Sequence, residues 1–188
     1  NEYSDWEQNP NNNGNGPDVY TTTNCASSYS LPYFNDFGEV DAATGQPNAE
    51  AISSWSSCSI FHNLDTDNPN PGYVNFWHIT PLDASNVAAV SFSWFENQIL
   101  SPDNWFILGP MDLTNEPDAL LTWDMAIFDS TYYADNYTVY VGTSYQTQDL
   151  IDSSLVTFNE IPQPADFGQL NARESVSYTH LRAHETCE

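Results

Sequence analysis

The chain has 188 residues, 40% hydrophobic and 14% aromatic, so it is long and apolar enough to fold around a core. It carries 26 Asp and Glu residues against 2 Lys and Arg residues, a formal net charge of -24. Nucleic-acid binding draws most of its affinity from Lys and Arg on phosphates, so this charge excludes nucleic acid as an expected partner. Because the carboxylates also repel one another in the folded state, we expect bound divalent cations, with Ca2+ as the natural candidate.

The first part of the chain differs in composition from the rest. Residues 1–24 are rich in Asn, Gly, Pro and Thr without hydrophobic periodicity, which predicts a linker. The folded domain is expected over residues 25–174. No run of about 20 apolar residues occurs, so no membrane span is expected in this segment.

The three cysteines, Cys25, Cys58 and Cys187, match no zinc-site spacing, because no Cys-x-x-Cys pair occurs. A disulfide between Cys25 and Cys58 fits an oxidising compartment, and two free thiols fit the sequence equally well. Both alternatives stay open.

The hydrophobic pattern from Cys25 onward has a period of two. Apolar residues alternate with polar or small ones in "VSFSWF" (90–95), "LTWDMAI" (121–127) and "NYTVYVG" (136–142). The run "NWFIL" (104–108) is expected to be a strand covered on both faces, or one that passes from a covered to an uncovered part of a sheet. With no convincing helix longer than a turn or two, the chain is predicted to be an all-β sandwich.

Three tryptophans within these strands, Trp94, Trp105 and Trp123, are expected in the core. On this interpretation Trp105→Ala costs about 3–5 kcal/mol of stability, as large core truncations do.

The segment "DTDNPNPG" (65–72) is the first candidate metal site. Asp65 and Asp67 place two carboxylates on a Gly/Pro loop, and Ca2+ prefers such oxygen ligands. An EF-hand is excluded, because Pro69 and Phe76 stand where that loop requires ligands. The alternative is a solvated acidic turn. Asp36 and Glu39 form a second acidic cluster.

Aromatic side chains suggest a ligand surface, because Trp and Tyr stack on sugar rings with little entropy loss. The candidates are Trp55, Trp77, Tyr132 and Tyr133, the last two beside a turn.

No sequence pattern supports catalysis. Nucleophile-elbow, zinc-peptidase, nucleotide-loop and dinucleotide-binding motifs are all absent. His62 and His78 stand on apolar strands, where a lone histidine is more often structural, and an abundance of acids makes chance carboxylate pairs common. The segment is expected not to be an enzyme.

The segments "LSPDNWFILGPMDL" (100–113) and "ALLTWDMAIFDSTYYADNYTVYVGTS" (119–144) resemble the cleaved-adhesin or choice-of-anchor-J family. These MAM-like jelly-roll modules occur in secreted and cell-surface proteins of Bacteroidetes-type bacteria. The segments "SLPYFNDFGE" (30–39) and "LDTDNPNPGYVNFW" (64–77) resemble the family less specifically, and Gly38 stands where the family usually has Glu. The resemblance implies a jelly roll of two antiparallel sheets.

The resemblance also carries expectations about function. Asp135 matches an acidic residue of the family's turn and becomes a third candidate calcium ligand. We expect a calcium-stabilised, non-catalytic adhesion or accessory module, secreted or at the cell surface, that binds an extracellular protein or glycan beside other domains of its parent chain. The alternative is a carbohydrate-binding module attached to a secreted glycoside hydrolase or peptidase.

The last residues change composition abruptly. Arg173 and Arg182 are the only basic residues, and "SYTHLRAHET" (177–186) looks like translated adapter sequence. We interpret residues 175–188 as a non-native tail and the sandwich as truncated at its C-terminal strands, which would leave a bare sheet edge.

Overall fold

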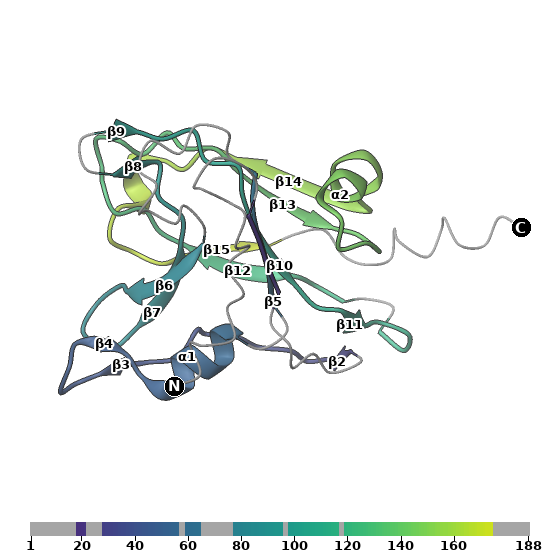
Figure 1. The fold of residues 1–188 in the computed structure, drawn as a ribbon, viewed down its shortest axis with the longest axis horizontal. Helices are drawn as coiled ribbons and strands as arrows, with labels where there is room; N and C mark the ends of the chain where they lie inside the picture. The colour runs from purple at the N-terminus through teal and green to yellow at the C-terminus, as the bar shows by residue number, and fades with distance from the viewer. Residues whose placement is uncertain are drawn as a thin grey trace, which may run out of the picture. The chain divides into compact units, whose positions relative to one another are not determined.

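The computed structural model describes residues 18–21, 28–56, 59–64, 77–95, 98–116 and 119–174 (Figure 1). Most of their regular structure is β-strand, paired in antiparallel sheets, with few and short helices. The all-β prediction is therefore confirmed. The jelly-roll order of strands stays a prediction.

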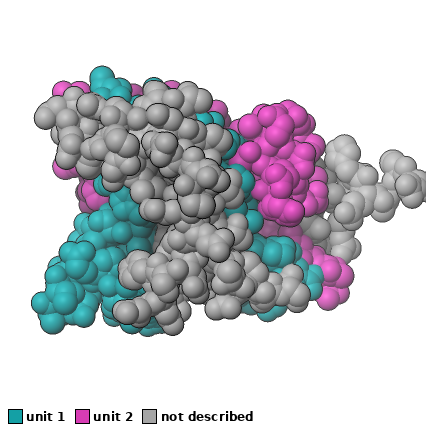
Figure 2. Space-filling view, in the orientation of Figure 1, with its two compact units in different colours: residues 1–112 teal, residues 113–188 magenta. Residues whose placement is uncertain are grey.

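The chain packs as two compact units, Asn1–Asp112 (unit 1) and Leu113–Glu188 (unit 2), shown in different colours in Figure 2. The sequence predicted one domain over residues 25–174, so the division at residue 112 is a feature that the strand pattern did not reveal.

Unit 1 contains one α-helix and eleven strands among its described residues. The helix is α1 (Ala49–Ser56), and the strands are β1 (Asp18–Thr21), β2 (Tyr29–Ser30), β3 (Val40–Asp41), β4 (Gln46–Pro47), β5 (Ser59–Asn63), β6 (His78–Pro81), β7 (Val87–Val90), β8 (Trp94–Phe95), β9 (Gln98–Ile99), β10 (Asn104–Leu108) and β11 (Met111–Asp112).

Unit 2 contains four strands, one α-helix and one 3-10 turn in the part that the structure describes. They are β12 (Thr122–Met125), β13 (Tyr137–Val141), α2 (Thr147–Ser153), β14 (Val156–Glu160), η2 (Pro164–Asp166) and β15 (Asn171–Glu174). β12 pairs with β15 and β13 pairs with β14, both antiparallel.

Strand β1 lies inside residues 1–24, the segment predicted as a linker. It pairs antiparallel with β5, with Val19 opposite His62, and β5 pairs on its other side with β10. The result is a three-stranded sheet in the order β1-β5-β10. The linker prediction is wrong at these four residues, because backbone pairing with a distant strand orders a segment whose local composition favours disorder.

The core of unit 1 is centred on Phe61 in the middle of β5. Its side chain is fully buried, and its ring stacks on that of Phe106 with 5.3 Å between centroids and 4° between planes. Partly buried residues from several elements complete the cluster around Phe61: Phe37, Trp77, Ile79, Ala89 and Phe106.

The position of Trp105 corrects a sequence expectation. Successive side chains of a strand point to opposite faces, so Phe106 takes the core face of β10 and Trp105 takes the other. Trp105 is half-buried, and its indole N–H donates to the carboxylate of Asp103 (2.8 Å). All five residues of β10 are partly covered, which agrees with the expectation that both faces of this strand are shielded.

The strand predicted over residues 90–95 is interrupted. β7 ends at Val90 and β8 begins at Trp94. Between them, the ring of Phe92 packs against that of His78, 5.1 Å away. The side chain of Trp94 lies outside the described residues.

The interior of unit 2 follows the predicted alternation. In β12, Trp123 and Met125 are partly buried while Thr122 and Asp124 are exposed. The ring of Trp123 meets that of Phe158 in β14 edge-on, with 5.0 Å between centroids. Leu121, which the pattern placed on the inward face, precedes the strand and is 40% exposed.

Candidate functional site

The first predicted metal site, Asp65 and Asp67, lies outside the described residues. Its calcium assignment therefore stays a prediction. Elsewhere, within the part of the chain that the structure describes, no three His, Cys, Asp or Glu side chains come together as a metal-binding group.

The second acidic cluster, Asp36 and Glu39, lies at a tight turn before β3. The backbone N–H of Phe37 donates to Asn35 Oδ1, and that of Gly38 donates to Asp36 Oδ1, each at 2.9 Å. Asp36 and Glu39 are both exposed. One oxygen of Asp36 thus serves the turn itself, as the Asx-turn alternative expects.

The same turn gives a physical reason for glycine at position 38. Phe37 and Gly38 have φ values of 59° and 80°, a backbone region that costs side chains energy. A Cβ at Gly38 would lie 2.5 Å from the Cα of Ala51 in α1, closer than atoms pack. The turn therefore requires glycine, and it directs Phe37 onto the Phe61 cluster.

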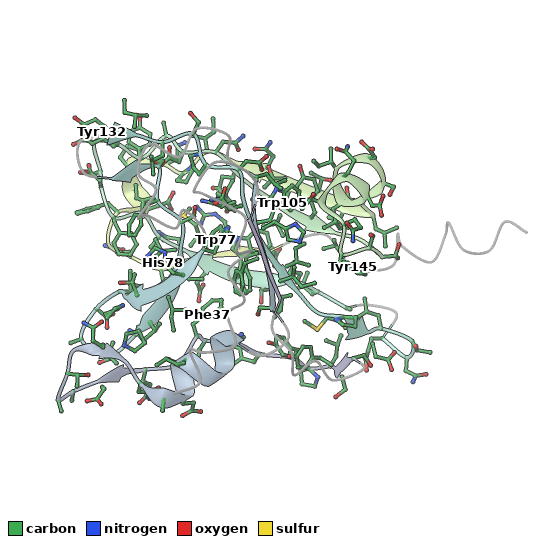
Figure 3. The ribbon with its side chains drawn as sticks, viewed as in Figure 1. Phe37, Trp77, His78, Trp105, Tyr132 and Tyr145 are labelled. Carbon is green, nitrogen blue, oxygen red and sulfur yellow. The ribbon has the colours of Figure 1, made fainter. Side chains whose placement is uncertain are left out.

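Trp77, predicted on a ligand surface, lies instead in the core of unit 1 (Figure 3). Its indole N–H donates to the carbonyl of Asn104 (3.0 Å), and its ring is 6.4 Å from that of Phe106. A side chain committed to packing and to a backbone hydrogen bond does not serve as a stacking platform. Trp55 lies on α1, and its side chain is outside the described residues.

The predicted tyrosines behave differently. Asp129 Oδ1 accepts hydrogen bonds from the backbone N–H groups of Thr131 (2.7 Å) and Tyr132 (3.2 Å), which holds residues 129–132 in a local turn. Tyr132 lies in this turn and is 81% exposed, whereas Tyr133 is half-buried. Asp135, the third predicted calcium ligand, is exposed in the segment that leads into β13.

A second segment lies beside the turn. The N–H of Ile127 donates to the carbonyl of Asp166, and the N–H of Gly168 donates to the carbonyl of Ile127, both at 3.1 Å. Large apolar side chains on these two segments remain about half exposed: Phe128 (47%), Phe167 (49%) and Leu170 (48%).

An ion-pair network supports this region from inside. The Nε–H of Arg173 donates to both carboxylate oxygens of Glu160 (2.9 and 3.0 Å), and its Nη2 donates to Asp166 Oδ1 (3.0 Å). The side chains of Arg173, Glu160 and Asp166 are only 19%, 21% and 7% exposed. Arg173 is the only Lys or Arg among the described residues, so the one cation there is used internally.

Tyr137 extends the network toward the hydrophobic interior. Its hydroxyl donates to Glu160 Oε2 (2.5 Å) and accepts from the indole N–H of Trp123 (3.3 Å). Burial, together with the bond to the Glu160 carboxylate, raises the pKa of Tyr137 to about 12. A phenol held neutral in this way is unsuited to nucleophilic or base chemistry near neutral pH.

The two acids of the network are held ionised. Hydrogen bonds from Arg173 lower the pKa of Glu160, and the backbone N–H of Gln163 with the Arg173 guanidinium lowers that of Asp166. Carboxylates with lowered pKa values are poor general acids. The network therefore has a structural role: through Arg173 and Glu160 it links the β12/β15 pair to the β13/β14 pair.

The two strand histidines occupy the sheet positions that the sequence suggested. His62 lies opposite Trp105 in the β5/β10 register, and burial lowers its pKa. His78 begins β6 and packs on Phe92.

The sequence missed the Arg173 network, although one signal pointed to it. A lone Arg in a strongly acidic segment is surrounded by acids with which it can pair, and in β15 it alternates with exposed Ala172 and Glu174. The inward direction of Arg173 is seen only in the structure, because the residues Asn-Ala-Arg-Glu show no apolar alternation that would predict it. The acidic partners, 7 and 13 residues away, could not be identified without the fold.

Comparison with models of protein families, with curated proteins and with solved structures gives no match for this chain. Among the described residues, no helix is long and apolar enough to cross a membrane.

Proposed function

We propose that this chain is a non-catalytic extracellular module that serves adhesion or accessory binding within a larger secreted or cell-surface protein. The observation that carries the proposal is the Asp129 turn, in which Tyr132 is 81% exposed. Tyrosine gives a large contact area at low entropy cost, and a backbone already held by hydrogen bonds lowers that cost further. The resemblance to cleaved-adhesin modules supports the same class of function.

Structural calcium is part of this proposal. The ligands we propose are Asp65 and Asp67, with Asp36, Glu39 and Asp135 as further candidates at separate positions in the chain. A net charge of -24 concentrates divalent cations near the surface and gives their binding a physical reason.

A carbohydrate-binding module is the second candidate function. The exposure of Tyr132 favours it, because a tyrosine face stacks on a pyranose ring. The same net charge disfavours anionic polysaccharides, so neutral glycans are the expected class.

Binding of the purified protein to immobilised mucin and gelatin, and its retardation in native gels that contain xylan, mannan or β-glucan, tests these proposals. We expect saturable binding to at least one probe, reduced about tenfold or more by Tyr132→Ala, as loss of an aromatic anchor typically does. Tyr145→Ala is the matched control, because Tyr145 is 61% exposed and lies at the opposite end of unit 2 (Figure 3). Equal losses in both variants, or no binding to any probe, would contradict the proposal.

A further inference from the structure

The strand pair β13/β14 (Figure 1) has one face toward the interior of unit 2 and one face away from it. The ring of Phe158 in β14 meets that of Trp123 in β12 at 5.0 Å and that of Tyr137 in β13 at 6.2 Å, so this side of the pair faces inward. Successive residues of a strand point to opposite faces. The sequence neighbours of Phe158, Thr157 and Asn159, therefore point outward, and both are exposed.

Four residues make up this outward side. Thr138 lies directly opposite Asn159, and Tyr140 lies directly opposite Thr157. Opposite residues of an antiparallel pair have Cβ atoms about 5 Å apart, and alternate residues of one strand are about 7 Å apart, so the four side chains form one patch. We call Thr138, Tyr140, Thr157 and Asn159 the β13/β14 outer face.

The β13/β14 outer face carries groups that can hydrogen-bond a ligand. Within the part of the chain that the structure describes, the Thr138 hydroxyl and the Asn159 amide have no hydrogen-bond partner. The Thr157 hydroxyl shares one hydrogen bond with that of Ser154 (2.7 Å) and has capacity for another. Hydroxyl and amide groups both donate and accept, as the hydroxyl groups of a sugar do. The half-buried Tyr140 adds the edge of an aromatic ring.

The composition of the β13/β14 outer face determines which ligand fits. It contains no Asp, Glu, Lys or Arg, although 26 of the 188 residues of the chain are Asp or Glu. A cationic partner therefore finds no carboxylate on this face, and the net charge of -24 repels polyanions. Tyr140 is its only large side chain with apolar surface, whereas the core of a protein–protein interface needs several. These properties favour a neutral ligand that is rich in hydroxyl groups.

We propose that the β13/β14 outer face binds a neutral polysaccharide chain. Thr138 and Asn159 hydrogen-bond the hydroxyl groups of the sugar, and Tyr140 contacts its C–H surface. Backbone pairing already holds these residues in place, which lowers the entropy cost of binding. The inference rests on the proposed role as a binding module, names the ligand class, and adds a second site to Tyr132.

Affinity electrophoresis of the whole protein in gels that contain mannan, xylan or mixed-linkage β-glucan tests the inference, with carboxymethylcellulose as the anionic control. We expect saturable retardation by at least one neutral polymer and little by carboxymethylcellulose. T138V/N159L preserves the approximate size of both side chains and removes their hydrogen-bonding groups, so affinity should fall about tenfold or more. The matched control T122V/D124N changes two exposed residues of β12 and should leave affinity unchanged.

A second variant guards against loss of folding in the first. Asn159→Ala changes one exposed side chain and leaves Thr138 intact, so it should weaken binding a few-fold. Circular dichroism verifies that each variant is folded.

Four outcomes would overturn the inference: no retardation by any neutral polymer, equal losses in the two double variants, equal retardation by carboxymethylcellulose, or a loss in T138V/N159L that affects gelatin alone, which would assign the face to a protein partner.

Failure of this inference is distinguishable from failure of the proposed function. If binding to mucin, gelatin or a glycan depends on Tyr132 and is unchanged in T138V/N159L, the inference falls and the proposed function stands. If polysaccharide binding is lost in T138V/N159L and survives Tyr132→Ala, the inference stands and Tyr132 is not the anchor.

Discussion

Gly38 is a residue whose identity is decided by both backbone angle and space. Its φ of 80° already disfavours a side chain, and a Cβ would approach Ala51 in α1 to 2.5 Å. Gly45 has a similar φ of 67° but nothing within 4 Å of its Cβ position. A substitution at Gly45 therefore measures the energetic cost of the backbone angle alone.

We expect Gly38→Ala to lower the free energy of unfolding clearly more than Gly45→Ala does. The backbone conformation costs about 1–2 kcal/mol at either position, and Gly38→Ala adds the displacement of α1. Urea denaturation of both variants measures the difference. Equal losses would show that α1 moves away from the turn at no cost.

Phe61 and Trp105 test the assignment of the core. Phe61→Ala removes a fully buried ring and is expected to cost about 3–5 kcal/mol. Trp105→Ala is expected to cost less, because its side chain is half-buried on the other face of the sheet. Denaturant unfolding measures the loss in the free energy of unfolding for each variant. A larger loss for Trp105→Ala than for Phe61→Ala would show that Trp105 belongs to the core.

Tyr137 couples stability to alkaline pH. Its folded pKa of about 12 lies above the unfolded value of about 10, so the folded state favours the neutral phenol. This stabilisation is fully present below pH 10 and is lost as pH rises toward 12. Tyr137→Phe should therefore flatten the fall in stability across that window, measured by denaturation at stepwise pH. An unchanged slope in the variant would exclude Tyr137 as the source.

At the scale of elements, Arg173 joins the β12/β15 and β13/β14 strand pairs. It lies in β15 and binds Glu160 at the end of β14 and Asp166 in η2. An isolated two-stranded pair is marginal in water, so the contacts between pairs have a large share in the stability of unit 2.

We expect Arg173→Met to destabilise the protein by about 2 kcal/mol or more at neutral pH, since it leaves partly buried carboxylates without their charged partner. Both carboxyl groups have lowered folded pKa values. Their contribution is therefore present above the unfolded values of about 4 and is lost as pH falls further, so the variant and the parent should converge in acid.

Unfolding curves of the parent and Arg173→Met at pH 7 and in acid measure this convergence. Arg182→Met removes the same charge from the segment predicted as a non-native tail, and it controls for the change in net charge. If both variants lose the same stability, the loss comes from the change in net charge and not from the ion pairs of Arg173 with Glu160 and Asp166.

At the scale of the whole molecule, the net charge of -24 should make stability depend on ions. NaCl screens the repulsion between carboxylates and is expected to raise the melting temperature gradually. Calcium at matched ionic strength should raise it further. A site of micromolar affinity adds about 4 kcal/mol at a thousandfold excess of ligand.

Thermal melts with EDTA, then with Ca2+ or Mg2+, separate screening from site binding. Asp65→Ala and Asp67→Ala should abolish the extra shift if their loop holds the metal. Shifts of equal size for calcium, magnesium and NaCl at the same ionic strength would leave these acids as solvated turn residues.

Local patterns predicted the class of structure well. Alternation placed Trp123 and Met125 inward and Thr122 and Asp124 outward, because the period of a strand is set by its backbone. The turn beside Tyr132 and Tyr133 predicted exposure for both, which is confirmed for Tyr132 and wrong for the half-buried Tyr133. The placement of Trp77 could not be predicted in this way, because an apolar aromatic residue suits a core and a binding surface equally.

The sequence by itself determined that this is an acidic, β-rich chain, because charge and a two-residue period are properties that each segment carries alone. Only the tertiary structure decided that β1 belongs to a sheet, that Phe106 rather than Trp105 faces the core, and that Arg173 pairs with Glu160 and Asp166. Those outcomes depend on which distant segments meet, and pairing between strands is selected by the free energy of the assembled unit, which no single segment contains.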